Sequence, residues 1–264
     1  MEFGVTTVVA VSIEDPHELL ELFHATATAV GAALADITDW GPSGRRDGQY
    51  AADLVADAVA LDYLRAAGVG ILSEESGTEH VGRRIVVIVD PLDGSTNASR
   101  GVPWYATSLC AFDEEGPLAA LVVNQARGTR YSAIRGEGAQ RDSVPFTCSS
   151  TCTTLAEGFI GLSGYPARPF GWDQFRTLGA GALDLCLVAE GTLDGFVDCV
   201  SGHGVWDYAG AWLVCHEAGA LMVDGLGREL IMRDYAARRA PVAAATPELL
   251  DALLEARRRS VLAT

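Results

Sequence analysis

The sequence predicts an α+β fold in the first half of the chain and an α/β fold in the second half. Three observations support this prediction. Apolar residues recur at helical spacing in two long segments near the start of the chain. Apolar runs separated by glycine and acidic turns then follow over residues 85–134, as in an antiparallel meander. From residue 158 onward, short strand-like runs alternate with helical segments.

The composition is that of a globular protein with a buried core. The chain has 264 residues, of which 49% are hydrophobic, and a formal net charge of −16. That charge disfavours nucleic acid and anionic membranes as routine partners. The six cysteines are scattered through apolar surroundings, which is typical of small core residues and not of a disulfide framework. Neither a signal peptide nor a membrane-spanning run is visible, so we expect a cytoplasmic protein.

The first predicted helix begins at Asp15, which would act as its N-cap. Pro16 would occupy the first helical position, and Glu18 would complete a capping box. The predicted core stripe consists of Leu19, Phe23, Ala27, Val30, Leu34 and Ile37. Residues 1–14 fit either a short strand or an irregular lead-in, and residues 39–48, which are rich in Gly and Arg, predict a loop.

A second helix is predicted over residues 50–67. Its apolar face would consist of Leu54, Ala58, Leu61 and Leu64. Asp53 and Asp57 lie near its beginning, where carboxylates also interact favourably with the helix dipole.

A short apolar segment then leads into two adjacent glutamates, Glu74 and Glu75. Adjacent glutamates are usually solvated, but these two lie shortly before the most apolar strand of the chain. Residues 85–89 are all β-branched and predict a buried strand that reaches Asp90. Because proline cannot donate a hydrogen bond to a sheet, we expect the strand to end at Pro91.

The segment Asp90-Pro-Leu-Asp-Gly-Ser-Thr-Asn97 places two carboxylates and the Leu92 carbonyl on one tight loop. Such oxygen ligands suit hard cations such as Mg²⁺. The backbone N–H groups from Gly94 to Thr96 form a concavity that suits an anion. Asp-Pro and Asp-Gly pairs also occur in turns that only reverse the chain. Because an apolar strand precedes and hydroxyl groups follow, we interpret this strand end as a site of phosphoryl chemistry.

The predicted meander continues with three extended segments, at residues 101–112, 118–125 and 130–134. Residues 113–116 and 136–139 read as turns. The polar segment 142–154 predicts a boundary between an N-terminal domain, residues 1–145, and a C-terminal domain, residues 146–264.

The second half is predicted to alternate strands and helices. The strands would cover residues 158–162, 195–198, 220–224 and 241–244. The helices would cover residues 173–178, 180–189, 206–218 and 247–259. Asp207 lies at the start of one of these helices, where an acid alone is best explained by capping or by the helix dipole.

Two motifs of the chain resemble the signatures of one protein family. Asp90-Pro-Leu-Asp-Gly-Ser-Thr-Asn97 resembles the first signature of the inositol monophosphatase family of metal-dependent phosphatases. Trp206-Asp-Tyr-Ala-Gly-Ala-Trp-Leu-Val-Cys-His-Glu-Ala-Gly-Ala220 is similar to the second, in which the aspartate after tryptophan is a metal ligand. Leu72-Ser-Glu-Glu-Ser76 resembles the family's paired glutamates, and residues 101–108 and 176–189 fit the segments beside the two signatures.

This resemblance, which extends over residues 47–225, implies both a fold and an activity. The fold would be a layered αβαβα sandwich, α+β in its first domain and α/β in its second, that usually forms a homodimer. The activity would be lithium-sensitive, Mg²⁺-dependent hydrolysis of a phosphomonoester. The ligands of two or three Mg²⁺ ions would be Glu74, Asp90, Asp93, Asp207 and the carbonyl of Leu92.

The resemblance also implies further site residues. Glu74, Asp53 and Ser95 would be catalytic, and Asp53 and Ser95 together would orient the attacking water. The phosphate would lie against the N–H groups of the segment after Asp93. The residues that contact the substrate would be Asp93, Gly94, Ser95, Thr96, Asp198 and Asp207.

Three residues depart from the family's pattern without removing a metal ligand. Ser95 replaces the usual threonine, Tyr50 stands where a threonine is common, and Ala98 replaces a frequent aromatic residue. Beyond the metal site, the polar residues Asp198, Ser201 and His203 suit the recognition of hydroxyl groups.

We therefore expect a small polyol phosphate as substrate, with myo-inositol 1-phosphate first. Fructose 1,6-bisphosphate, histidinol phosphate and 3′-phosphoadenosine phosphate are alternatives with the same chemistry. An alternative of another class is a non-catalytic relative that binds metal or ligand as a regulator. The intact carboxylates at Glu74, Asp90 and Asp93 disfavour that alternative.

Overall fold

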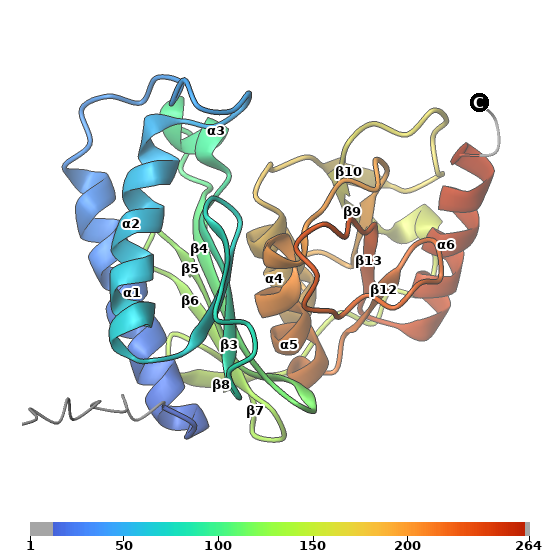
Figure 1. Ribbon diagram of the computed structural model, residues 1–264. Helices are drawn as coiled ribbons and strands as arrows, with labels where there is room; N and C mark the ends of the chain where they lie inside the picture. Colours follow the sequence, from blue (N-terminus) through green and yellow to red (C-terminus); the bar gives the residue numbers. More distant parts are fainter. Residues whose placement is uncertain (1–12, 262–264) are drawn as a thin grey trace, which may run out of the picture.

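Helical layers and sheets alternate through the molecule (Figure 1). In the computed structural model, which describes residues 13–261, the N-terminal helices α1 and α2 cover one face of an eight-stranded sheet. Helices α4 and α5 lie between this sheet and a five-stranded sheet, and α6 covers the far face of the second sheet. This αβαβα order confirms the predicted layered fold. Most of the segment 1–14 lies outside the described residues.

Helix α1 (Pro16–Ala35) begins where it was predicted. A carboxylate oxygen of Asp15 accepts hydrogen bonds from the backbone N–H groups of His17 and Glu18, at 2.8 and 3.3 Å. The helix ends before Ile37, which packs against the core from outside the helix. The rest of the predicted stripe is buried and consists of Leu19, Phe23, Ala27, Val30 and Leu34.

Helix α2 (Ala51–Ala66) forms as predicted, but its buried face differs from the prediction. Leu54 is only half-buried and Ala58 is exposed. The buried residues are Ala52, Asp53, Ala56, Asp57, Ala60, Leu61 and Leu64. Small alanine side chains let α2 pack closely against α1 and the sheet. Asp53 and Asp57 therefore point into the molecule, where both find hydrogen-bond partners.

The first sheet has the strand order β2-β1-β3-β4-β5-β6-β7-β8. Its strands are β1 (Gly70–Ser73), β2 (Gly77–Glu79), β3 (Val86–Asp93), β4 (Ala106–Asp113), β5 (Gly116–Asn124), β6 (Arg130–Ile134), β7 (Gly138–Arg141) and β8 (Val144–Phe146). Strands β1 and β3 are parallel, and the meander from β3 to β8 is antiparallel. Strand β8 lies in the segment 142–154, and the domain boundary placed there remains a prediction.

The second sheet has the strand order β10-β9-β11-β13-β12. Its strands are β9 (Phe159–Ser163), β10 (Gln174–Arg176), β11 (Gly195–Asp198), β12 (Leu221–Asp224) and β13 (Pro241–Ala244). The helix predicted over residues 173–178 is wrong, because β10 pairs with β9 in parallel there. So short a segment has little helical stability of its own, whereas the edge of β9 offers hydrogen bonds to an extended chain.

The helices of the second half match the prediction more closely. They are α4 (Gly181–Glu190), α5 (Ala209–Ala218) and α6 (Pro247–Val261), with single turns at η1 (Leu155–Glu157) and η2 (Val205–Asp207). Gly191 and Gly219 end α4 and α5 with φ of 82° and 87°, in the left-handed region that glycine adopts without strain. Asp207 belongs to the turn η2 and precedes α5.

The apolar core confirms the interpretation of the cysteines. All six cysteines are free, and Cys110, Cys186 and Cys215 are fully buried. The apolar cluster that contains them draws residues from both sheets and from the helical layer between them. Among the described residues, no helix is long and apolar enough to cross a bilayer.

Candidate active site

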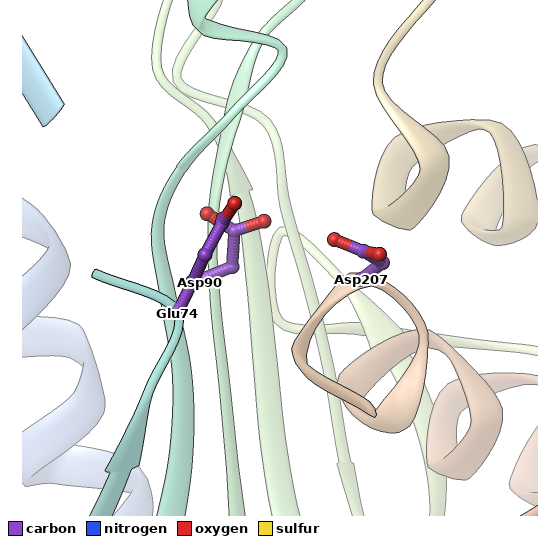
Figure 2. A group of neighbouring side chains, drawn as sticks. All are labelled: Glu74, Asp90 and Asp207. Atoms are coloured by element: carbon purple, nitrogen blue, oxygen red, sulfur yellow. The ribbon is translucent and has the colours of Figure 1, made fainter. Parts of the chain in front are cut away.

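Three carboxylates from separate segments converge beside the end of β3 (Figure 2). Glu74 directly follows β1, Asp90 belongs to β3, and Asp207 ends the turn η2. One oxygen of each carboxylate lies within 4.8 Å of one oxygen of each of the others. The parallel pairing of β1 and β3 explains the meeting of the first two. The backbone N–H of Glu74 donates to the carbonyl of Val89 at 3.1 Å, which holds Glu74 beside Asp90.

Strand β3 continues through the motif instead of ending at Pro91, as the sequence led us to expect. The pairing with β4 shifts register between Asp90 and Asp93, which is a bulge that accommodates the proline. The Thr107 hydroxyl donates to the Pro91 carbonyl at 2.9 Å, and the Leu92 N–H donates to the Asp90 carboxylate at 3.1 Å. The loop is therefore fixed from both sides.

Asp93 lies outside the group of three carboxylates. Its two oxygens accept hydrogen bonds from the backbone N–H groups of Gly181 and Ala182, at 3.2 and 2.8 Å. Asp93 thus joins the first sheet to the beginning of α4. Asp93 nevertheless lines one cavity together with the three carboxylates.

One cavity of about 120 Å³ brings the predicted residues together. It is lined by Arg46, Gly48, Asp53, Glu74, Glu75, Asp90, Leu92, Asp93, Gly94, Ser95 and Asp207. This set includes all five predicted metal ligands and all three predicted catalytic residues. Thr96 and Asp198, which were predicted to contact substrate, are not among the lining residues. The roles of all these residues remain predictions.

The electrostatics of the cavity favour a bound cation. Burial raises the pKa of Asp90 and of Glu74 well above the ordinary values, and the neighbouring carboxylates raise them further. Burial and Asp207 raise the pKa of Asp93 to about 8. So many acidic oxygens at short range are unfavourable unless protons or a cation balance their charge. An all-oxygen, acidic donor set fits Mg²⁺.

The predicted water-orienting pair lies beside this cluster. The Asp53 carboxylate accepts a hydrogen bond from the Tyr50 N–H at 2.7 Å. Burial raises the pKa of Asp53 to about 6, while the Tyr50 N–H and the nearby Ser95 hydroxyl oppose that rise. Ser95 begins the short helix α3 (Ser95–Ser99), after Gly94 at φ 82°. The Tyr50 hydroxyl is 3.3 Å from that of Thr96, so this departure from the family's pattern ties α2 to α3.

His203 connects Asp207 to the second sheet. Its Nδ1 lies 3.2 Å from a carboxylate oxygen of Asp207, and its Nε2 lies 2.9 Å from the Ser163 hydroxyl. Asp198 is fully buried and lies 3.6 Å from the same Nε2. Its carboxylate also accepts hydrogen bonds from the N–H groups of two residues in the following turn. Asp198 is thus connected to the cavity through His203 and Asp207, and hydroxyl recognition by Asp198 remains a prediction.

The comparison with known proteins agrees with these motifs. The model of the inositol monophosphatase family matches residues 15–262. The chain belongs to this family. Among curated inositol monophosphatase relatives, the fructose-1,6-bisphosphatase/inositol-1-monophosphatase of Methanocaldococcus jannaschii is 31% identical over 211 residues, which cover 77% of this chain and 82% of that protein. The Nus factor SuhB of Escherichia coli is 30% identical over 235 residues, which cover 80% and 86%.

Solved structures show the same inositol monophosphatase fold. A Pyrococcus horikoshii protein described as similar to inositol-1 monophosphatase superposes with a TM-score of 0.79 at 25% identity, covering 91% of this chain and 96% of its own. The extragenic suppressor protein SuhB from Bartonella henselae gives a TM-score of 0.78 at 25% identity, with coverages of 92% and 99%.

Several residues around this inositol monophosphatase site had no predicted role. The second glutamate of the pair, Glu75, accepts hydrogen bonds from Arg46, at 2.8 Å, and from Gln49. Arg46 also lies 3.7 Å from a carboxylate oxygen of Glu74, and is the positive charge among the residues that line the cavity. Asp57 accepts hydrogen bonds from the hydroxyls of Ser73, at 2.5 Å, and of Ser76. The sequence held a signal for Asp57, because it follows Asp53 at helical spacing.

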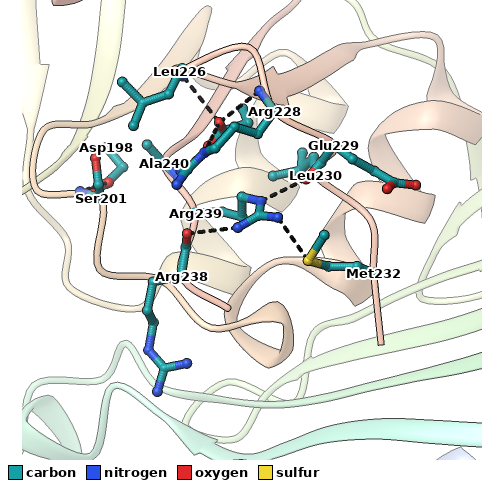
Figure 3. A network of polar contacts seen from close by, with 12 residues as sticks. Asp198, Ser201, Leu226, Arg228, Glu229, Leu230, Met232, Arg238, Arg239 and Ala240 are labelled. Carbon is teal, nitrogen blue, oxygen red and sulfur yellow. Dashed lines mark hydrogen bonds and ion pairs between the residues drawn. The ribbon is translucent and has the colours of Figure 1, made fainter. Parts of the chain in front are cut away.

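The segment between β12 and β13 also supports the site. The Tyr235 hydroxyl donates to the Glu74 carbonyl at 3.0 Å, and the Arg238 guanidinium lies 4.9 Å from the centre of the Trp206 ring. The backbone of Arg239 pairs with that of His203. Figure 3 shows the side chain of Arg239 held by the Glu229 and Arg238 carbonyls and by the Met232 sulfur. No sequence motif marks this segment.

Proposed function

We propose that this chain is a Mg²⁺-dependent phosphomonoesterase that hydrolyses a small polyol phosphate, with myo-inositol 1-phosphate as its first substrate. The observation that carries the proposal is the acidic cavity in which Asp53 and Ser95 lie beside the carboxylate cluster. Membership of the inositol monophosphatase family and relatives named as phosphatases support the phosphatase chemistry.

The residues that would hold Mg²⁺ are Glu74, Asp90, Asp93, Asp207 and the carbonyl of Leu92. Magnesium bound there would stabilise the negative charge of the phosphate and would lower the pKa of water. The hydrogen bonds from α4 to Asp93 and from the Leu92 N–H to Asp90 fix the orientation of these carboxylates before anything binds. Such pre-organisation removes a reorganisation cost from the reaction.

The protein's own groups would then position the reactants. Asp53 and Ser95 both line the acidic cavity, and the pair would orient a water molecule toward phosphorus. The backbone N–H groups of Gly94, Ser95 and Thr96 would donate hydrogen bonds to the phosphate oxygens. Attack by water would release inorganic phosphate and the free alcohol, without a covalent enzyme intermediate.

Fructose 1,6-bisphosphate is the second candidate substrate, because four of the curated relatives are named for both activities. A regulatory role remains a separate candidate, since other relatives carry the name Nus factor SuhB. We further propose that the chain forms a homodimer. The expectation that nucleic acid is not a routine partner rests on the acidic charge alone.

A substrate panel tests the proposed function. Phosphate release is measured with and without Mg²⁺ for myo-inositol 1-phosphate, fructose 1,6-bisphosphate, histidinol phosphate and 3′-phosphoadenosine phosphate. We expect Mg²⁺-dependent turnover with the highest kcat/KM for the inositol ester. A higher value for another ester would correct the substrate, whereas no turnover of any ester would favour the regulatory role.

A further inference from the structure

We propose that a second cavity, around Arg257 on α6, binds a small organic anion that carries a carboxylate or phosphate on a flat apolar group. This cavity has a volume of about 240 Å³. It is lined by Tyr165, Pro166, Ala167, Phe170, Cys199, Arg257 and Ser260. None of these residues lines the acidic cavity, so the two sites are separate.

Arg257 is the central observation, because the residue is only 2% exposed and an arginine is costly to bury without a negative partner. Its Nε donates to the Asp198 carbonyl at 2.7 Å, Nη1 to the Gly225 carbonyl at 3.3 Å, and Nη2 to the Ser201 hydroxyl at 2.8 Å. All three acceptors are neutral. Among residues 13–261, Arg257 forms no ion pair with a carboxylate.

Two donors of this guanidinium are therefore available to a ligand. Each terminal nitrogen carries a second N–H beyond the one already bonded within the described residues. The nearby carboxylate of Asp198 is occupied by two N–H groups of its own turn and by His203. Figure 3 shows Asp198 and Ser201 on the turn beside the segment from Leu226 to Ala240. A planar anion accepting both free N–H groups would supply the missing negative charge.

The surroundings favour an anion with an apolar part. Phe170 and Tyr165 border the cavity, and the Phe170 ring packs against Trp172 with 5.0 Å between ring centres. Tyr165 is 86% exposed, which is unusual for an aromatic residue and leaves its ring free to cover a ligand. The site thus combines a buried positive charge with an aromatic wall.

A neighbouring cavity extends the positive region. It has a volume of about 210 Å³, shares Phe170 and Ser260 with the first, and adds Arg168 and Arg259. The backbone N–H of Arg168 donates to the Ser260 hydroxyl at 3.3 Å, and Ser260 lines both cavities. Of these three arginines, Arg259 lies 3.5 Å from a carboxylate oxygen of Glu255, so Arg168 and Arg257 supply the positive charge of this region in a chain whose net charge is −16. This region would draw anions away from the rest of the repulsive surface.

The test uses phenyl phosphate, benzoate and phenol as probes, in EDTA, where the acidic cavity repels anions. Binding to the full-length protein is measured by calorimetry and located by amide NMR shifts. We expect phenyl phosphate and benzoate to bind and to shift the amides of Cys199 and Ser260, whereas phenol binds at least about tenfold more weakly. No saturable binding of either anion at millimolar concentration would overturn the proposal.

Variants identify the site. Arg257→Gln should abolish binding, and the exposed substitution Ala167→Trp, which narrows the cavity without touching the core, should weaken it at least about tenfold. The control is Arg258→Gln, which removes a charge from the same helix outside both cavities and should leave affinity unchanged. If Arg257→Gln fails to fold, Ala167→Trp decides. Undiminished binding by a folded Ala167→Trp variant would place the anion elsewhere and refute the site.

Discussion

Asp93 shows how one side chain serves both the fold and the proposed chemistry. It lines the acidic cavity while both of its oxygens accept N–H groups at the start of α4. A residue in this position is pre-oriented by the helix that it helps to hold. Its charge and its geometry therefore contribute separately, and a substitution that keeps the shape can distinguish them.

The substitution Asp93→Asn keeps the size of the side chain and removes its charge. We expect the affinity for Mg²⁺ and kcat each to fall by at least about 100-fold, because a ligand charge is lost. Calorimetric Mg²⁺ titration and phosphate release measure the two quantities. Asp62→Asn, an exposed change on α2, is the matched control and should be silent. A folded Asp93→Asn protein with normal turnover would remove Asp93 from the site.

Single residues were predictable only where their signal was local. The carboxylates of the two signatures and the paired glutamates stand in recognisable order along the sequence. Tyr235, Gln49 and Arg46 gave no such signal, because their partners lie far away in the chain and ordinary loop residues look the same. Long-range hydrogen bonds of this kind become visible only in the folded protein.

At the scale of elements, the predictions failed where periodicity was weak. The stripe of α1 was correct because large apolar residues repeat over several turns. The face of α2 was misjudged because alanine carries little hydrophobic signal, and its two inward carboxylates masked the pattern. The short strand β10 was assigned to a helix because its pairing with β9 depends on distant residues.

The segment after β12 is an element whose stability depends on one carboxylate. Asp224 accepts hydrogen bonds from the N–H groups of Leu226, Arg228 and Ala240, and from two nitrogens of the Arg228 guanidinium. Burial acts to raise the pKa of Asp224, but these donors outweigh it and lower the pKa from 3.8 to about 2. The charged form is therefore favoured by folding. Its stabilising contribution is complete above about pH 4 and is lost as the pH falls toward 2.

We expect Asp224→Asn to lower the free energy of unfolding by about 2 kcal/mol at pH 7. The difference from the wild type should shrink as the pH falls from 4 toward 2, since the wild-type carboxylate is then protonated. Urea unfolding of both proteins across this range measures the effect. Asp251→Asn, an exposed change on α6, controls for net charge. A difference that is independent of pH would mean that shape, and not charge, holds the segment.

At the scale of the whole molecule, the layered architecture was predicted from the resemblance between two motifs and a family. The motifs predict the fold because their carboxylates can meet only when the parallel pair β1 and β3 and the turn η2 are all in place. The assembly of the chain with other copies leaves no comparable signal in the sequence. The domain boundary in residues 142–154 also remains a prediction.

Because the whole molecule is acidic, a requirement for cations can be tested on the intact protein. We expect EDTA to abolish phosphate release and added Mg²⁺ to raise Tm, because cations relieve the repulsion in the carboxylate cluster. Lithium should inhibit by occupying a cation position, with sodium chloride at equal ionic strength as the control. Full activity in excess EDTA would contradict the metal mechanism, and equal effects of lithium and sodium would reduce the inhibition to screening.

The carboxylate cluster draws Glu74 and Asp90 from the first sheet and Asp207 from the turn before α5, far later in the chain. No part of the polypeptide can assemble it alone, so the cluster exists only after these distant segments have come together. An ion bound there would link these distant segments, and the unfolded chain has no such binding site. The ion would stabilise the chain only late in folding, and it would therefore slow unfolding more than it speeds folding.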